Sequence, residues 1–300
     1  MGAAIKADGL VMTYGGLRAV DGVSFEVGQG EFFGILGPNG AGKTTALEMV
    51  EGLRKPQAGT VTIDGSEPWK RAPALVRRMG VQLQSASFFD RLTAREQLDS
   101  FGALYGVARG RTKEMLERVG LVDKAEIQTE DLSGGQKQRL SIACALIHDP
   151  DVVFLDEPTA ALDPQARRNL WDLLRGLNDS GRTVILTTHY MDEAEALCDR
   201  VAIMDAGKIL ELDTPAALSR GLDAPARISV APGTLDADAA RAIAGDDEVR
   251  DADSALMITT RDPSRVLSAL AQRDALGGLS VKGASLEDVF LELTGREYRA

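Results

Sequence analysis

The loop at residues 37–45 constrains the fold of this chain more than any other segment. Its sequence, GPNGAGKTT, fits the pattern G-x-x-x-x-G-K-[ST]. The apolar run EFFGILG precedes the loop, and KTTALEMVEGL follows it with the apolar spacing of a helix. The loop is therefore predicted to join a buried strand to a helix, and this setting argues against a chance glycine-rich turn.

A loop of this kind binds phosphate groups. Its glycines let backbone N–H groups surround phosphate oxygens, and the start of the following helix adds the positive end of its dipole. Lys43 brings a charge to the terminal phosphates, and Thr44 can offer its hydroxyl to Mg²⁺. The candidate nucleotide-binding residues are Gly37, Pro38, Asn39, Gly40, Ala41, Gly42, Lys43, Thr44 and Thr45.

Two further strand ends carry polar side chains that suit phosphate chemistry. Asp156 and Glu157 end the apolar run DVVFLDE, and His189 ends VILTTH. We expect Asp156 to hold Mg²⁺ through its water shell and Glu157 to polarise the attacking water. The carboxyl ends of parallel strands meet at one edge of a sheet, so His189 is predicted to lie in the same crevice and to join the catalytic group with Glu157 and Lys43.

The hydrophobic pattern predicts an α/β fold in two domains. Near-continuous apolar strands alternate with helices, which indicates a parallel sheet covered on both faces. We expect antiparallel strands over residues 5–30, a helical insert over about 85–130 and a nucleotide-binding domain over 1–220. A Pro, Gly and Ala-rich join at 214–226 leads to an accessory domain, 221–300, whose βαββαβ order is ferredoxin-like.

Composition excludes several other classes of protein. The chain has 34 basic and 45 acidic residues, a net charge of −11, which argues against a nucleic-acid binder that works by bulk charge. Cys144 and Cys198 belong to no C-x-x-C pair, so we interpret both as small apolar fillers in a reducing compartment. We expect neither a secretory signal nor a membrane-spanning helix, because no apolar run approaches about 20 residues.

The segment LSGGQKQR at residues 132–139 identifies a family. Together with the phosphate loop, the Asp-Glu strand and His189, it closely resembles the signature of the nucleotide-binding subunits of ABC transporters, over about residues 5–215. The resemblance implies a P-loop NTPase (RecA-like) core with an antiparallel β subdomain, and a chain that hydrolyses ATP with Mg²⁺. Taken alone, LSGGQ is also compatible with a helix-capping loop in which Ser133 is the N-cap.

The resemblance also assigns roles to single residues. Tyr14 matches the aromatic residue that stacks on adenine, an ordinary core tyrosine being the alternative. Asp163 matches the aspartate that touches the opposing subunit. Gln84 matches the glutamine that contacts Mg²⁺ and water, but Gln82 stays open because Leu83 stands where many relatives have proline. The signature residues that would face the γ-phosphate held by a second subunit are Ser133, Gly134, Gly135 and Gln136.

One chain of this kind cannot complete its own site. Two copies, or this chain and a relative, would sandwich two ATP molecules head to tail, and we expect a homodimer. The ending SLEDVFLELTGRE resembles the extension of ATPases that serve ABC-2 type exporters, the daunorubicin-resistance-like class. This implies a peripheral subunit on the cytoplasmic face of the membrane that powers export of a drug, lipid or polysaccharide through a separate permease.

The alternative is a soluble ABC ATPase acting in translation or DNA repair. Such proteins usually have tandem cassettes, long coiled coils, zinc-binding insertions or a basic surface, and the sequence has none of these. A P-loop kinase or GTPase does not require LSGGQ. The sequence also has no NKxD-like guanine-binding motif, which favours ATP over GTP.

Overall fold

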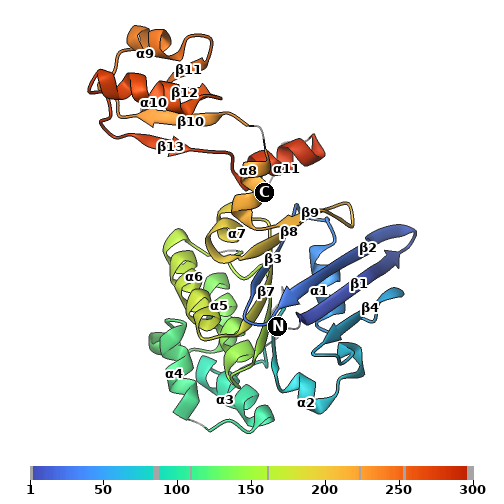
Figure 1. The fold of residues 1–300 in the computed structure, drawn as a ribbon. Coiled ribbons are helices and arrows are strands. Elements are labelled where there is room, and N and C mark those ends of the chain that lie inside the picture. The colour runs from blue at the N-terminus through green and yellow to red at the C-terminus, as the bar shows by residue number, and fades with distance from the viewer. Residues whose placement is uncertain are drawn as a thin grey trace. The chain divides into compact units, whose positions relative to one another are not determined.

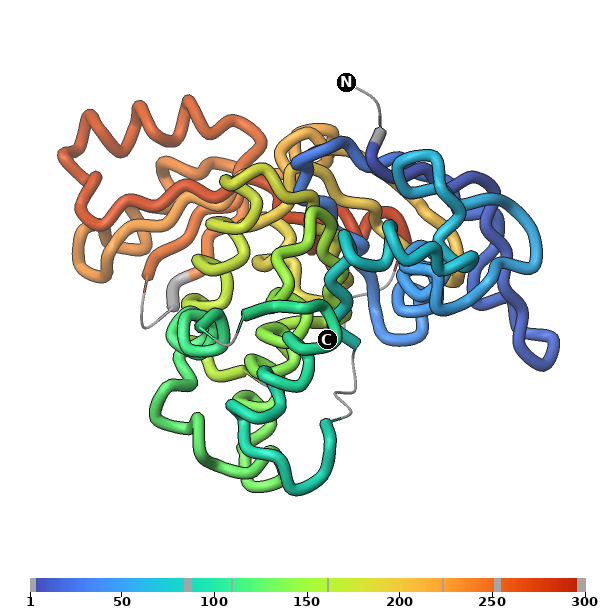
Figure 2. The backbone as a smooth tube through the Cα atoms, turned by 90° about the horizontal axis from the view of Figure 1, so that it is seen from below, coloured from blue at the N-terminus to red at the C-terminus, as the bar shows by residue number. Residues whose placement is uncertain are grey.

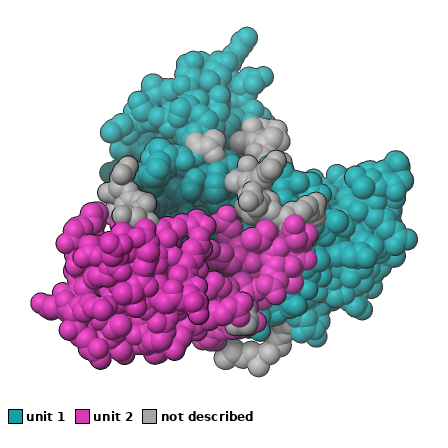
Figure 3. All heavy atoms as spheres, turned by 90° about the horizontal axis from the view of Figure 1, so that it is seen from above, with its two compact units in different colours: residues 1–215, 299–300 teal, residues 216–298 magenta. Residues whose placement is uncertain are grey.

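The computed structural model describes residues 3–83, 88–108, 110–160, 162–222, 224–252 and 255–295. Within it the chain divides into two compact units, residues 1–215 and residues 216–298, coloured separately in Figure 3. Each unit has its own apolar core. The second unit begins five residues before the expected boundary at 221.

The first unit contains two sheets. Its strands are β1 (Ala3–Tyr14), β2 (Leu17–Gly28), β3 (Phe32–Leu36), β4 (Ala58–Ile63), β5 (Met79–Gln82), β6 (Val152–Asp156), β7 (Thr183–Thr188), β8 (Arg200–Asp205) and β9 (Lys208–Asp213). Six of them form a sheet in the order β5-β6-β7-β3-β8-β9, parallel except for β9. The other three form an antiparallel sheet in the order β2-β1-β4, so the predicted α/β class and its antiparallel part are confirmed.

Helices cover both faces of the parallel sheet. The helices of the first unit up to β8 are α1 (Lys43–Val50), α2 (Pro73–Val76), α3 (Ala94–Tyr105), α4 (Gly110–Arg118), α5 (Gly134–Leu146), α6 (Pro164–Asp179) and α7 (Met191–Leu197). Figure 1 shows α5 and α6 on one side of the sheet and α1 on the other, facing the antiparallel sheet. The buried side chains of α1 join one apolar cluster with both sheets, which fixes the start of α1 against β3 and β6.

The predicted helical insert consists of α3 and α4 with two short 3₁₀ turns. These turns are η2 (Val122–Lys124) and η3 (Thr129–Asp131), and a third turn, η1 (Pro68–Lys70), precedes α2. Thr93 begins α3 through a capping box with Glu96. The helices α3 and α4 pack on each other and on α5, and they gather at one end of the first unit in Figure 2.

The second unit has the predicted βαββαβ order. Its elements are α8 (Pro215–Gly221), β10 (Ala226–Val230), α9 (Ala237–Ala244), β11 (Glu248–Ala252), β12 (Ala255–Thr260), α10 (Pro263–Gln272), β13 (Ser280–Lys282) and α11 (Leu286–Thr294). The antiparallel sheet has the order β11-β12-β10-β13, and side chains of α9 and α10 share one apolar cluster with it. The ferredoxin-like arrangement of the tail is confirmed.

The join between the units differs from its expected structure. Residues 214–226 read as an irregular linker, yet α8 occupies Pro215–Gly221, with Leu218 buried. The proline stands at the first helical position, where its missing N–H costs nothing. Cys144 and Cys198 are free and buried, as expected for apolar fillers. Among the described residues, no helix has the length and hydrophobicity needed to cross a bilayer.

Candidate active site

The predicted phosphate-binding loop connects β3 to α1 along a path that only glycine permits at two positions. A Cβ atom on Gly37 would lie 2.1 Å from the carbonyl oxygen of Met204. Gly42 has φ +99°, and a Cβ there would lie 2.1 Å from the carbonyl oxygen of Ala19. Gly42 is also the N-cap of α1 and offers no side chain to the first-turn amides. These amides therefore face the loop without a side-chain acceptor from their own cap.

Lys43 is buried at the first position of α1. Its Nζ donates hydrogen bonds to the carbonyl oxygens of Gly37 at 2.9 Å and Pro38 at 3.2 Å. The same Nζ lies 3.3 Å from Oε1 of Glu157, and only 4% of the lysine side chain is exposed. The loop thus holds a positive charge in a site largely shielded from water.

Asp156 ends the buried strand β6 and lies against α1. Its Oδ1 accepts hydrogen bonds from the hydroxyls of Thr44, at 3.2 Å, and Thr187. Burial raises the pKa of Asp156 above its usual value, and the hydrogen bonds from Thr187 and Thr44 oppose that rise. A hydroxyl and a carboxylate on adjacent elements are oxygen donors of the kind that Mg²⁺ prefers. The donor set therefore fits magnesium.

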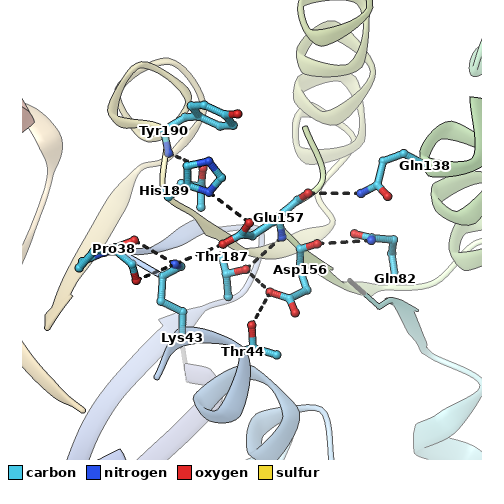
Figure 4. Close-up of polar contacts among 12 residues, drawn as sticks. Pro38, Lys43, Thr44, Gln82, Gln138, Asp156, Glu157, Thr187, His189 and Tyr190 are labelled. Atoms are coloured by element: carbon cyan, nitrogen blue, oxygen red, sulfur yellow. Dashed lines mark hydrogen bonds and ion pairs between the residues drawn. The ribbon is translucent and has the colours of Figure 1, made fainter. Parts of the chain in front are cut away.

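Glu157 lies between the lysine and the histidine. Its Oε1 is 3.3 Å from Nζ of Lys43, and its Oε2 is 3.1 Å from Nδ1 of His189, as Figure 4 shows. The backbone N–H of Glu157 donates to both the carbonyl and the hydroxyl oxygen of Thr187, at 3.1 and 3.0 Å. Its φ is +47°, a left-handed conformation that is uncommon for any residue except glycine. The backbone conformation of Glu157 is therefore strained, and it sets the direction in which this carboxylate points.

In the structure Lys43, Thr44, Asp156, Glu157 and His189 lie close together, as the sequence predicted. It missed two side chains that hold the end of β6. Thr187 bonds both acidic residues, and Gln138 on α5 donates from Nε2 to the carbonyl oxygen of Glu157 at 3.3 Å. The register of β6 and β7 pairs Asp156 with Thr187, a signal that requires knowing which strands are adjacent.

Of the two candidate glutamines, the structure describes only Gln82. Gln84 lies outside the described residues. Gln82 is buried at the end of β5, and its Nε2 donates to the carbonyl oxygens of Leu83 at 2.6 Å and Asp156 at 3.4 Å. Its Oε1 is buried and makes no hydrogen bond within the described residues. Gln82 therefore places an unpaired amide oxygen beside the candidate metal-binding strand.

The signature residues lie at the start of α5, outside this hydrogen-bonded cluster in the described part of the chain. Ser133 is the N-cap of α5, and its Oγ accepts from the backbone N–H of Gln136 while Oε1 of Gln136 accepts from the N–H of Ser133. The capping interpretation of Ser133 is confirmed. Ser133 and Gly134 are exposed, and Gly135 and Gln136 are partly exposed, so the signature faces solvent in the single chain.

Asp163 and Tyr14 also lie apart from the cluster. Asp163 is the N-cap of α6, and its Oδ1 accepts from the N–H groups of Gln165 and Ala166, a role that sequence reasoning missed. Tyr14 is the last residue of β1, with 41% of its surface exposed and the guanidinium of Arg54 5.3 Å from its ring centre. It is not a core tyrosine.

Glu51, at the C-terminal end of α1, is a buried carboxyl that the sequence did not reveal. Burial first, and then the charges of Asp156 and Glu48, raise its pKa from 4.5 to about 8. The folded chain therefore keeps a proton that the unfolded chain releases above pH 4.5. The free energy of unfolding therefore falls as pH rises from about 4.5 to about 8, where the Glu51 carboxyl loses its proton in the folded state. Above about pH 8 the fold carries the full cost of the buried charge.

Replacement of Glu51 by glutamine is expected to remove that cost. The free energy of unfolding of the variant should rise relative to that of the wild type between pH 5 and pH 8, and the difference should reach on the order of 5 kcal/mol at pH 9. Guanidinium unfolding followed by tryptophan fluorescence reports on the first unit alone, because both tryptophans, Trp69 and Trp171, lie in it. A difference that does not change between pH 5 and pH 9 would contradict the raised pKa.

Comparisons with known proteins agree with this geometry. The family model described as "ABC transporter" matches residues 20–160. The Nod factor export ATP-binding protein I of Paraburkholderia xenovorans is 41% identical, covering 98% of this chain and 98% of that protein. The daunorubicin/doxorubicin resistance ATP-binding protein of Streptomyces peucetius is 39% identical, covering 97% and 92%. A dimeric ATP-binding cassette in a post-hydrolysis state with ADP and Pi is 30% identical, with TM-score 0.65, covering 70% of this chain and 98% of that one.

The chain therefore belongs to the family of ABC transporter ATP-binding proteins. The solved cassette of this family described above is a dimer. This chain is an ATP-binding and ATP-hydrolysing subunit of the exporter type. The soluble alternative in translation or DNA repair is not favoured, because these relatives are export and drug-resistance proteins over nearly the whole chain.

Proposed function

We propose that this chain is the motor subunit of an ABC-2 type exporter. It acts as a homodimer at the cytoplasmic face of the membrane and drives a drug, lipid or polysaccharide through a separate permease. The extent of the similarities supports this assignment. The solved cassette covers 70% of the chain, whereas the export and resistance proteins cover 97–98% and so include the C-terminal accessory domain, residues 221–300.

The position of Glu157 between Lys43 and His189 is the observation that carries the catalytic proposal. Nζ of Lys43 would bind the terminal phosphates, and the Glu157 carboxylate would orient water and accept its proton. His189 would hold that carboxylate and the γ-phosphate in line. These are the positioning and charge-stabilising tasks that phosphoryl transfer leaves to a protein.

Magnesium fits the oxygen donors at the end of β6. Thr44 would bind it through Oγ1 and Asp156 through its water shell, with Gln84, or the neighbouring Gln82, as the third group. Mg²⁺ would supply charge neutralisation at the β- and γ-phosphate oxygens. Mg²⁺ in phosphate sites is usually held by one or two protein groups together with waters and phosphate oxygens, which agrees with the small number of donors proposed here.

The exposed residues would act between subunits. Tyr14 would stack on adenine, and the signature at 133–136 would present the amides of the α5 start to the γ-phosphate bound by the partner. Asp163 would contact the partner beside that phosphate. ATP then binds the closed pair more tightly than the open one, and loss of the γ-phosphate contacts after hydrolysis lets the pair open.

The helical insert would transmit this motion to the permease. A groove of about 200 Å³ between α3, α5 and β5 supports the assignment, because its lining is mainly apolar and includes Leu83, Phe101 and Tyr105. Leu83 follows Gln82, whose side chain bonds the carbonyl of Asp156. A permease segment in this groove would therefore contact Leu83, the residue that directly follows Gln82 of the nucleotide site.

Copurification tests the exporter assignment. A tagged Glu157→Gln protein, produced in its native cells and solubilised gently with ATP present, should bring down a polytopic membrane protein in stoichiometric amount, identified by mass spectrometry. Tagged Lys43→Ala protein is the control for nucleotide-dependent assembly. Recovery only from the soluble fraction, alone or with ribosomal or repair proteins, would overturn the exporter assignment and leave the ATPase assignment standing.

A further inference from the structure

Glu193 is a completely buried carboxyl that the hydrolysis mechanism does not use. It lies on α7, the helix that follows His189, and its side chain has 0% exposure. Burial raises its pKa, and the Thr188 and Thr159 hydroxyls, the Trp171 indole and the Arg167 charge oppose that rise. A buried acid costs stability relative to an apolar side chain of similar size, so stability of the fold does not explain its presence.

The polar groups that oppose the rise in the pKa of Glu193 come from three separate elements, and one of them is hydrogen-bonded to its carboxylate. Its Oε1 accepts a hydrogen bond of 3.1 Å from Nε1 of Trp171, on α6. Its Oε2 makes no hydrogen bond in the described part of the chain, and neither does the buried hydroxyl of Thr159. Thr188, at the end of β7, accepts at Oγ1 from the N–H of Tyr190 at 2.9 Å.

Each of these elements carries a residue of the nucleotide site. Thr188 directly precedes His189, Thr159 follows Glu157 by two residues, and the helix of Trp171 has Asp163 as its N-cap. The Glu193 carboxyl is therefore the point at which the histidine strand, the turn after the base and the helix behind Asp163 come together. Two unpaired polar atoms, Oε2 of Glu193 and Oγ1 of Thr159, leave room for one further hydrogen bond between α7 and that turn.

We propose that Glu193 is a positioning residue that sets His189 against Glu157 by tying α7, which follows the histidine, to α6, the helix that follows the turn after the base. The proposal rests on the catalytic roles proposed for Glu157 and His189. Glu193 acts through the elements that carry these two side chains. Its loss displaces the two reacting side chains relative to each other, and a displacement of about 1 Å costs up to roughly 100-fold in rate.

Substitutions at 193 separate positioning from stability. In the full-length protein, Glu193→Leu and Glu193→Ala should lower kcat for ATP hydrolysis about 10- to 100-fold while KM for ATP stays within about twofold. Glu193→Gln, which keeps the shape and the hydrogen-bonding atoms, should restore kcat to within about threefold of wild type. Glu195→Ala, an exposed acid on the same helix, is the matched control and should behave as wild type.

The thermal unfolding midpoint completes the test. Glu193→Leu should unfold at or above the wild-type temperature and yet be slow, whereas a purely structural role predicts that activity follows stability. Wild-type kcat in Glu193→Leu or Glu193→Ala overturns the proposal. If both fail to fold, Trp171→Phe removes only the indole donor, and an unchanged kcat there overturns it equally. Glu157→Gln is assayed in parallel, because normal turnover in that variant defeats the catalytic assignment instead.

Discussion

Replacement of Glu157 by glutamine is expected to lower ATP turnover by about two to three orders of magnitude while leaving ATP binding intact. Glutamine keeps the shape of the side chain between Lys43 and His189 but cannot accept a proton from water. In the proposed cycle hydrolysis releases the closed pair, so the variant should accumulate as a nucleotide-bound dimer. Phosphate release measures turnover, and light scattering with and without ATP measures the dimer.

Two comparisons make the Glu157 result decisive. Glu195→Gln changes an exposed acid on α7 and should leave turnover unchanged. Equilibrium titration with a fluorescent ATP analogue should give the same dissociation constant for Glu157→Gln and the wild type, to within about threefold. Normal turnover in Glu157→Gln would eliminate this carboxylate as the base.

Replacement of Lys43 by alanine should instead act on binding and weaken ATP affinity by about 100-fold. The substitution removes a buried positive charge that the loop holds with the Gly37 and Pro38 carbonyls. It also leaves Glu157 without its cationic neighbour, which adds repulsion toward the phosphates. Isothermal titration calorimetry with ATP and Mg²⁺ measures the effect.

The matched control for Lys43 is Lys6→Ala, since Lys6 is an exposed lysine paired with Glu26. Its ATP affinity should equal that of the wild type. An unchanged dissociation constant in Lys43→Ala would mean that the loop does not bind the terminal phosphates through this side chain. Together with Glu157→Gln, the pair separates a loss of binding from a loss of chemistry.

Local patterns in the sequence were enough for much of this site. The phosphate loop, the acidic pair and His189 each lie where a buried strand ends, and the edge of a parallel sheet brings such ends together. The same alternation of apolar runs predicted both sheets and the ferredoxin-like tail. In contrast α8 was missed, because Pro and Gly in the join read as breaks although the proline occupies a first helical turn.

What escaped prediction depends on contacts between distant segments. Gln138 reaches Glu157 across 19 residues, and Trp171 reaches Glu193 across 22. Nothing near Glu193 or Glu51 in the sequence marks them as buried, since acids on helices are usually exposed. The N-cap role of Asp163 could have been predicted, because an aspartate before proline at a helix start is a capping signal. The family resemblance assigned Asp163 only a contact with the partner subunit.

Because the backbone at Glu157 is left-handed, selection for stability and selection for ATP hydrolysis favour different residues at this position. Glycine would relieve the conformational cost of φ +47° at this position, but it would remove the carboxylate. Variants selected only for thermal resistance should therefore accumulate glycine or asparagine at 157 and lose hydrolysis, whereas selection for transport should retain glutamate. A deep mutational scan can be scored separately by survival of heating and by growth that depends on transport. Heating should favour glycine or asparagine at position 157, whereas transport should favour glutamate.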